Sequence, residues 1–174
     1  PINFTVVFNE AIQPATFTNA DITQGGTATG VTWTVTNSGD DITFTVRATA
    51  ITGDGTLIPS IAVNAVKDVA GNNSAASSAT DNNITYDLTP PTAPSGLSLV
   101  TPATSPANNT TPTIQVSGVV IGDTVSLYTD SSCTTGNLKA TGTAAGVTID
   151  LTSSVLTANT YNFYAKSVDP AGNA

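Results

Sequence analysis

The stretch YDLTPPTAP at residues 86–94 divides the sequence into two similar halves. Its prolines fix the backbone φ angle, remove backbone N–H donors and bias the residues before them towards extended conformations. A stretch of this kind neither continues a helix nor lies inside a central strand. It therefore predicts a short, semi-rigid spacer between two modules.

A shared closing phrase supports this division. VKDVAGN stands at residues 66–72, before the spacer, and SVDPAGN stands at residues 167–173 in the second half. The repetition predicts two tandem domains, one at residues 1–88 and one at residues 95–174, joined by a proline-rich linker at residues 89–94.

The composition favours two small β-sandwiches. Each half of the 174-residue chain is long enough to bury a modest core, and the sequence is rich in threonine with no methionine or histidine. Charged residues make up 9% of the chain, against roughly 25% in an average soluble domain. We therefore expect a surface solvated mainly by hydroxyl and amide groups.

The charge pattern excludes several classes of partner. The net charge is −8, and four Lys and Arg residues are too few to neutralise nucleic-acid phosphates or an anionic membrane. No apolar stretch approaches the roughly 20 residues that a membrane helix needs. We expect neither a nucleic-acid partner nor direct membrane insertion.

Catalytic patterns are missing from the sequence. It has no histidine to act as a base, and Gly25-Gly26 lacks the Lys-Ser/Thr pair of a phosphate-binding loop. Asp40 and Asp41 are adjacent and would point to opposite faces of a strand. The sequence therefore predicts a protein that is not an enzyme.

Alternating apolar residues predict the strands of the first module. The clearest hairpin has strands around residues 31–35 and 42–46, joined by the turn NSGD at residues 37–40. Further strands are expected at residues 2–8, 57–63 and 84–86, with Pro59 marking an edge or bend, and residues 17–22 are expected between strands. Five strands are named here, and the module is expected to contain six in all, one fewer than an immunoglobulin-like sandwich contains.

These residues resemble a known family. The segments FTVVF (4–8), FTNADI (17–22), GDGTL (53–57) and DVAGN (68–72), in this order, are similar to the bacterial Ig-like repeats of giant surface proteins and biofilm adhesins. The resemblance covers nearly all of residues 1–87. It implies an immunoglobulin-like antiparallel β-sandwich whose first strand is missing.

The second module resembles a more general bacterial Ig-like or fibronectin-like repeat. Strands are expected near residues 97–99, 114–116, 125–127, 147–151 and 161–168. The phrase LTANTY (156–161) resembles the tyrosine corner of such sandwiches, in which the tyrosine hydroxyl bonds to the backbone upstream. Here the seventh strand is the missing one.

Two explanations are open for the missing strands. The chain may be a window cut from a longer tandem array, which is the favoured explanation. Alternatively, neighbouring subunits lend the absent strands, as in donor-strand assembly. An open sheet edge is otherwise an aggregation hazard.

Calcium is the candidate cofactor. In an Ig-like sandwich the loop after the sixth strand lies where the chain enters the domain, so Asp169 and Asn173 are expected beside Asp87 at the linker. By the same geometry, Asp68 would face a preceding module. Tandem adhesins that this chain resembles use calcium at their linkers. The alternative is that each phrase forms only a turn, with the aspartate bonding its own backbone.

Cys133 is the single cysteine and lies in a polar turn. An unpaired exposed thiol is unusual in a secreted protein, so its partner is expected in the missing final strand or in a neighbouring chain. A harmless free thiol is the alternative.

The sequence favours a structural repeat of an extracellular bacterial surface fibre or adhesin, acting as a stalk, a spacer or a self-assembling filament. Its expected partners are adjacent repeats or neighbouring subunits. The main alternative is a carbohydrate-binding module of a secreted hydrolase, which needs exposed aromatic side chains. Trp33 is expected in the core, so only Tyr128 and Tyr164 are available for a sugar platform. A phage or virion fibre domain is a third possibility.

Overall fold

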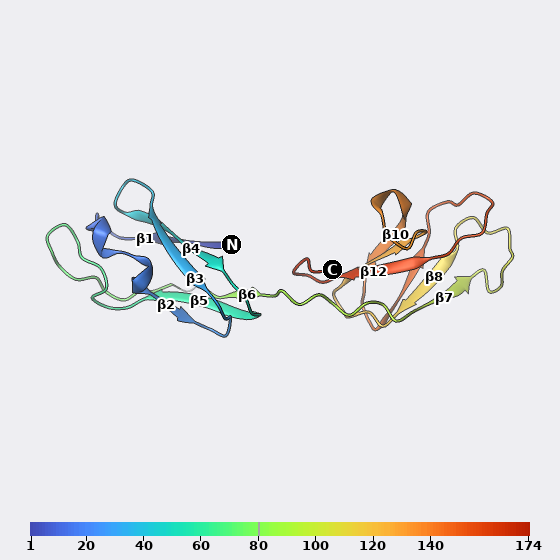
Figure 1. Cartoon of the computed structure of the whole chain (residues 1–174), viewed down its shortest axis with the longest axis horizontal. Helices are drawn as coiled ribbons and strands as arrows, with labels where there is room; N and C mark the ends of the chain where they lie inside the picture. The colour runs from blue at the N-terminus through green and yellow to red at the C-terminus, as the bar shows by residue number, and fades with distance from the viewer. Residues whose placement is uncertain (80) are drawn as a thin grey trace. The chain divides into compact units, whose positions relative to one another are not determined.

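The computed structural model describes residues 1–79 and 81–174, and its regular elements are β-strands and short 3-10 turns joined by loops. The chain divides into two units, Pro1–Leu88 and Thr89–Ala174 (Figure 1). Each unit contains two antiparallel sheets, so the expected all-β fold class is confirmed. Among these residues no helix is long and apolar enough to cross a membrane.

The first unit contains two three-stranded sheets. Their strand orders are β1-β4-β3 and β2-β5-β6. The strands are β1 (Ile2–Val7), β2 (Ile22–Gly25), β3 (Thr32–Asn37), β4 (Thr43–Ala50), β5 (Gly55–Ile61) and β6 (Ile84–Tyr86), with 3-10 turns η1 (Pro14–Thr16) and η2 (Asn19–Asp21) before β2.

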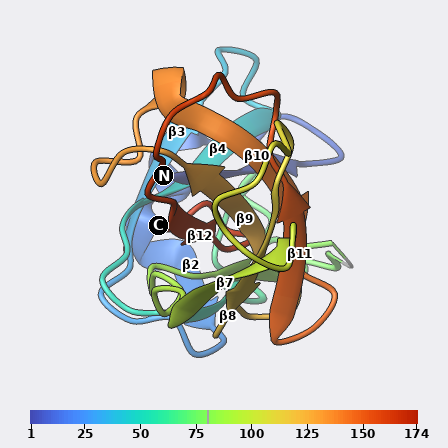
Figure 2. The same ribbon diagram turned by 90° about the vertical axis from the view of Figure 1, so that its right-hand side faces the viewer.

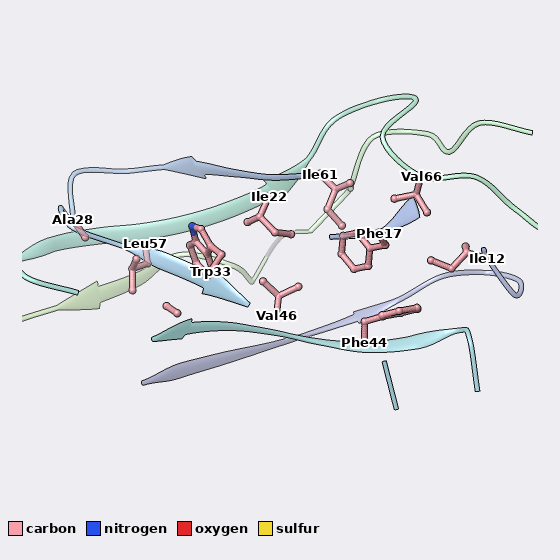
Figure 3. Close-up of a cluster of buried hydrophobic side chains, with 11 residues drawn as sticks. Ile12, Phe17, Ile22, Ala28, Trp33, Phe44, Val46, Leu57, Ile61 and Val66 are labelled. Atoms are coloured by element: carbon pink, nitrogen blue, oxygen red, sulfur yellow. The ribbon is translucent and has the colours of Figure 1, made fainter. Parts of the chain in front are cut away.

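The core of the first unit lies between these sheets (Figure 3). On β4, Phe44 and Val46 are each 1% exposed, as the alternating pattern predicts. Trp33 is 8% exposed and lies in the core, as expected. Phe17 packs edge-on against Phe44, with ring centroids 5.2 Å apart. This unit therefore has an apolar core of its own.

The second unit also contains two three-stranded sheets (Figure 2). Their orders are β11-β8-β7 and β10-β9-β12. The strands are β7 (Gly96–Thr101), β8 (Thr113–Ser117), β9 (Thr124–Tyr128), β10 (Leu138–Thr143), β11 (Thr148–Thr152) and β12 (Tyr164–Val168), with the 3-10 turn η3 (Thr135–Asn137) before β10. The second unit has a separate core of seven buried residues: Ile114, Val116, Val119, Val125, Leu127, Ala144 and Leu151.

The two units share a four-strand frame. In the first, β1 pairs with β4 and β2 pairs with β5; in the second, β8 pairs with β11 and β9 pairs with β12. Beyond this frame each unit has a strand that the other lacks among the described residues. β1 corresponds to β8, and β8 pairs with the additional strand β7, whereas no described strand occupies the same edge of β1. β12 corresponds to β5, and β5 pairs with the additional strand β6, whereas no described strand occupies the same edge of β12.

Strand register places both ends of each unit at the same end of its sandwich. Ile2 lies opposite Ala48 and Tyr86 lies opposite Gly55, on either side of the short connection from β4 to β5. In the second unit, Gly96 lies opposite Ser117 and Val168 lies opposite Thr124, on either side of the connection from β8 to β9.

Three details differ from the sequence-based expectation. β2 starts within the segment expected to lie between strands, and β10 was not expected at all. The strand expected from residue 161 begins only at Tyr164. Both unexpected strands lie at sheet edges, where little apolar patterning is needed because packing is weak.

Candidate functional site

The repeated phrase of the first unit forms a turn after β5 that is closed by its own side chains. Asp68 Oδ1 accepts a hydrogen bond from the Asn72 backbone N–H at 2.8 Å, and Oδ2 accepts one from Asn72 Nδ2 at 2.7 Å. The Asp68 N–H donates to the Asn72 carbonyl at 3.0 Å. Gly71 completes the turn at φ +92°, a value that glycine adopts readily.

This turn is also tied to the rest of its unit. Gln13 Nε2 donates to the Asp68 carbonyl at 2.8 Å, and Ile12 forms an isolated bridge with Asp68. Ile12 itself is buried in the core. The turn therefore fixes the loop after β5 to the segment after β1.

The second unit repeats the same turn after β12. Asp169 Oδ1 accepts from the Asn173 N–H at 2.8 Å and Oδ2 accepts from Asn173 Nδ2 at 2.9 Å. Gly172 lies at φ +95°, matching the glycine of the first turn. The two phrases recognised in the sequence are therefore one structural element used twice.

Hydrogen bonding to the carboxylates stabilises their charged form. The Asn72 side chain, followed by its backbone N–H, lowers the pKa of Asp68 below its ordinary value. The Asn173 side chain is the main cause of the lowered pKa of Asp169. Asp40, in the turn between β3 and β4, has a lowered pKa chiefly because the Thr43 backbone N–H donates to it at 2.7 Å.

The expected calcium ligands belong to different units. Asp68 and Asp87 lie in the first unit, and Asp169 and Asn173 lie in the second. Within the described residues, no three His, Cys, Asp or Glu side chains gather closely enough to hold a metal ion. A calcium ion shared by Asp87, Asp169 and Asn173 therefore stays a prediction.

Cys133 lies in a tight turn after β9 at φ +48° and is half-buried. Its N–H donates to the Asp130 carbonyl at 3.2 Å, and the Asp130 carboxylate accepts from the Thr134 hydroxyl at 3.0 Å. Cys133 is a free thiol in this structure, and its pairing with another strand stays a prediction.

Tyr128 and Tyr164 form the best-placed aromatic pair on the second unit. They lie directly opposite each other on β9 and β12, and both are half-buried. Their positions alternate with the buried Val125 and Leu127, so both side chains lie on the outer face of this sheet. They are the residues available to a flat ligand such as a sugar ring.

The expected tyrosine corner has a different partner. The Tyr161 hydroxyl lies 3.0 Å from Oγ1 of Thr157, a side-chain hydroxyl. The expectation that the Tyr161 hydroxyl bonds to the upstream backbone is therefore wrong, because its partner is a side-chain hydroxyl.

One feature that the sequence did not predict is a pair of grooves lined by both apolar and polar side chains. In the first unit a groove of about 680 Å³ runs along β1, and in the second a groove of about 900 Å³ runs beside β7 and residues 156–164. Each lies in a single unit. Sequence alternation identified the strands that line them but could not show which strands lack a neighbour.

Another feature that the sequence did not predict is a buried carboxylate. Asp123 precedes β9 and is only 1% exposed, and its Oδ2 has no hydrogen-bond partner within the described part of the chain. An aspartate in a turn gives no sequence signal of burial, because aspartate is common in exposed turns.

The chain was compared with known proteins at the level of families, curated sequences and solved structures. A family described as "Bacterial Ig-like domain" matches residues 1–88. No curated protein and no solved structure matches. The matched residues are those of the first unit.

Proposed function

Because this chain belongs to the bacterial Ig-like domain family, we propose that it is a structural segment of an extracellular bacterial surface fibre or adhesin. In this role its two units act as spacers in a stalk or filament. Their partners are adjacent repeats of the same protein or neighbouring subunits.

The observation that carries this proposal is the doubled architecture. Each unit has its own apolar core, the same four-strand frame and the same asparagine-closed turn. A unit that contains its own core folds without help from its neighbour, as tandem arrays require. The low content of charged residues, 9%, is compatible with an extracellular surface coated by hydroxyl and amide groups.

Single-molecule stretching tests the proposal. The whole chain, held between reference domains, is expected to unfold in two separate steps. Each step should lengthen the chain by about 30 nm, because a unit of roughly 85 residues extends by about 3.6 Å per residue. One step of about 60 nm would show that the halves unfold as a single body, and the proposal would fail.

Calcium is part of the proposal. The Asp68 and Asp169 carboxylates each accept two hydrogen bonds from an asparagine. A carboxylate has about four lone-pair sites, so each retains acceptor capacity for a hard cation. In a tandem array a calcium ion at these turns would restrict motion about the linker.

A carbohydrate-binding role is the second candidate. It is favoured by the outer-face pair Tyr128 and Tyr164, because adjacent aromatic rings can stack on sugars. A glycan array tests it directly. Binding by the chain that is lost in both Tyr128→Ala and Tyr164→Ala would establish this role in place of a purely structural one.

A further inference from the structure

The outer face of the sheet β10-β9-β12 is fixed by its register. Val125 and Leu127 of β9 are buried in the core, and Ala140 of β10 and Ala165 of β12 pack against that core. Side chains alternate between the two faces along a strand, and directly paired residues share a face. The outer face therefore carries the following side chains: Leu138, Thr141 and Thr143 from β10, Thr124, Ser126 and Tyr128 from β9, and Tyr164, Lys166 and Val168 from β12.

Three side chains form an apolar row across one end of this face. Tyr128 lies directly opposite Leu138 on one side and directly opposite Tyr164 on the other. Neighbouring strands are about 4.8 Å apart, so the row spans about 10 Å. Leu138 is 39% exposed, and both tyrosines are half-buried. The row offers an apolar, partly aromatic surface on which a sugar ring can stack.

A row of polar groups follows the apolar row. Ser126 lies directly opposite Thr141 on one side and directly opposite Lys166 on the other. Oγ of Ser126 and Oγ1 of Thr141 are 3.2 Å apart, so the two hydroxyl groups are held side by side. Two residues along a strand span about 7 Å, so a sugar ring stacked on the tyrosines has hydroxyl donors and acceptors beside it.

Lys166 gives the outer face a positive charge. It is exposed, and it extends the row of polar groups beyond Ser126. Lys139, at the register shift of β10, is a second cation of the same sheet. The chain has four Lys and Arg residues against 12 Asp and Glu residues. The strands β9, β10 and β12, which the structure describes throughout, contain no Asp or Glu. Half of the cationic residues of an acidic chain therefore lie in one sheet.

The carboxylates that flank this sheet along the chain are buried or hydrogen-bonded within their own turns. Asp123, before β9, is 1% exposed. Asp130, after β9, accepts hydrogen bonds from the hydroxyl and the backbone N–H of Thr134. Asp169 lies in the asparagine-closed turn after β12. The exposed ammonium of Lys166 is therefore left for a ligand on the outer face.

We propose that the outer face of the sheet β10-β9-β12 binds an acidic sugar, that is, a sugar ring that carries a carboxylate. The ring stacks on Tyr128 and Tyr164. Ser126 and Thr141 form hydrogen bonds with its hydroxyl groups. The Lys166 ammonium donates a charge-assisted hydrogen bond to its carboxylate. This inference deepens the carbohydrate-binding role and rests on it, because it names the class of sugar that the same two tyrosines take.

The arrangement favours an acidic sugar over a neutral sugar and over other anions. A neutral sugar leaves the ammonium without a charged partner, whereas a carboxylate provides one. A flexible acidic peptide can pair with Lys166 but has no rigid ring to place on the two tyrosines. The net charge of −8 opposes the approach of any anion, so stacking and short-range hydrogen bonds must supply part of the affinity. The ligand is therefore selected by the combination of ring and charge.

The test measures binding of the whole chain to oligomers of galacturonic, mannuronic and glucuronic acid by calorimetry. The matched probes are the methyl esters of the same oligomers, which keep the sugar rings and remove the negative charges. At least one acid should bind about fivefold more tightly than its ester at low salt. The difference should shrink in about 0.5 M salt, because exposed charges are then screened. Oligoglutamate, an acidic peptide, should bind more weakly than that acid.

Variants locate the site. Lys166→Gln should remove the preference for the acid over the ester, because it removes the charge, and Lys166→Arg should keep that preference. Tyr164→Ala should weaken binding of the acid at least about tenfold. Lys67→Gln, which removes a cation from the first unit, is the matched control and should bind like the unsubstituted chain. Thermal melting of the free chains checks that each variant is folded. If Tyr164→Ala is unfolded, the Lys166 variants decide the question.

Four outcomes would overturn the inference. Equal binding of acid and ester by the unsubstituted chain would do so and would leave the carbohydrate-binding role intact. A preference for the acid that survives in Lys166→Gln would show that the charge is read elsewhere. Equal binding of oligoglutamate would show that charge alone attracts the ligand. Absence of binding to every probe at millimolar concentration would overturn the carbohydrate-binding role as well, and the structural role of the two units would stand.

Discussion

Asn72 Nδ2 lies 2.7 Å from Asp68 Oδ2, and this contact closes the turn that follows β5. The equivalent pair in the second unit, Asn173 and Asp169, is separated by 2.9 Å. In both turns the asparagine backbone N–H bonds to the other carboxylate oxygen at 2.8 Å. Each asparagine thus donates a hydrogen bond to both carboxylate oxygens of its aspartate. This explains why the phrase ends with asparagine in both halves.

Acid should weaken both turns. The pKa values of Asp68 and Asp169 are lowered by their asparagine partners, below an unfolded value of about 3.9. Their contribution to stability is therefore complete above about pH 5 and is lost as the pH falls through the folded pKa values. Carboxyl NMR titration and melting curves at each pH measure this. In Asp68→Asn, the first unit should lose less stability on acidification than it does in the unsubstituted chain.

Gly172→Ala should destabilise the second unit. Gly172 lies at φ +95°, and although no atom would contact an added Cβ, the left-handed conformation costs an alanine about 1–2 kcal/mol. Gly136→Ala is the matched control, because that glycine also has open space but is not in this region. The control should be neutral or stabilising by about 0.4–1 kcal/mol in urea unfolding. Equal effects of the two substitutions would contradict the assigned turn.

Leu57→Ala should unfold the first unit selectively. Leu57 is fully buried in the core of this unit, so truncation should cost about 2–5 kcal/mol. Val63→Ala, at a position 60% exposed, should change stability by less than about 0.5 kcal/mol. Residue-resolved hydrogen exchange should show the loss in residues 1–88 alone. A comparable loss throughout the second unit would show that the two cores are not independent.

Calcium should raise the melting temperature if it binds at the turns. Millimolar calcium is expected to stabilise the chain by the linkage between ligand binding and folding, and magnesium should do so less because it needs near-octahedral geometry. Asp169→Asn should reduce the shift, since it removes a carboxylate ligand. Melting curves without any shift at millimolar calcium would contradict this prediction.

Sequence patterning predicted the parts of the fold that alternate clearly. The hairpin of β3 and β4 was located because Trp33, Val35, Phe44 and Val46 all face the interior. β10 was missed because its sequence, LKATGT, includes a lysine, a glycine and threonines and lacks a sustained apolar alternation. As an edge strand it is held largely by its ladder to β9, and backbone hydrogen bonds leave no residue-type signature.

The candidate sites also include features that the sequence predicted and features that it could not predict. DVAGN and DPAGN were interpreted correctly as possible turns, because aspartate, glycine and asparagine are turn residues for known physical reasons. The groove along β1 could not be predicted, since it depends on the pairing of β1 with β4 and on the position of residues 74–79 across from it. Such relationships join residues distant in the sequence.

The register that brings Ile2 and Tyr86 to one end of the first unit also decides how a pulling force acts on it. A force applied between these two residues peels β1 from β4 one hydrogen bond at a time, so the two strands separate under a small load. A force that pulls β1 and β4 in opposite directions along their length instead shears all the bonds of their ladder together, so the bonds share the load. The direction from which a neighbouring segment pulls on β1 therefore decides how much load the first unit bears.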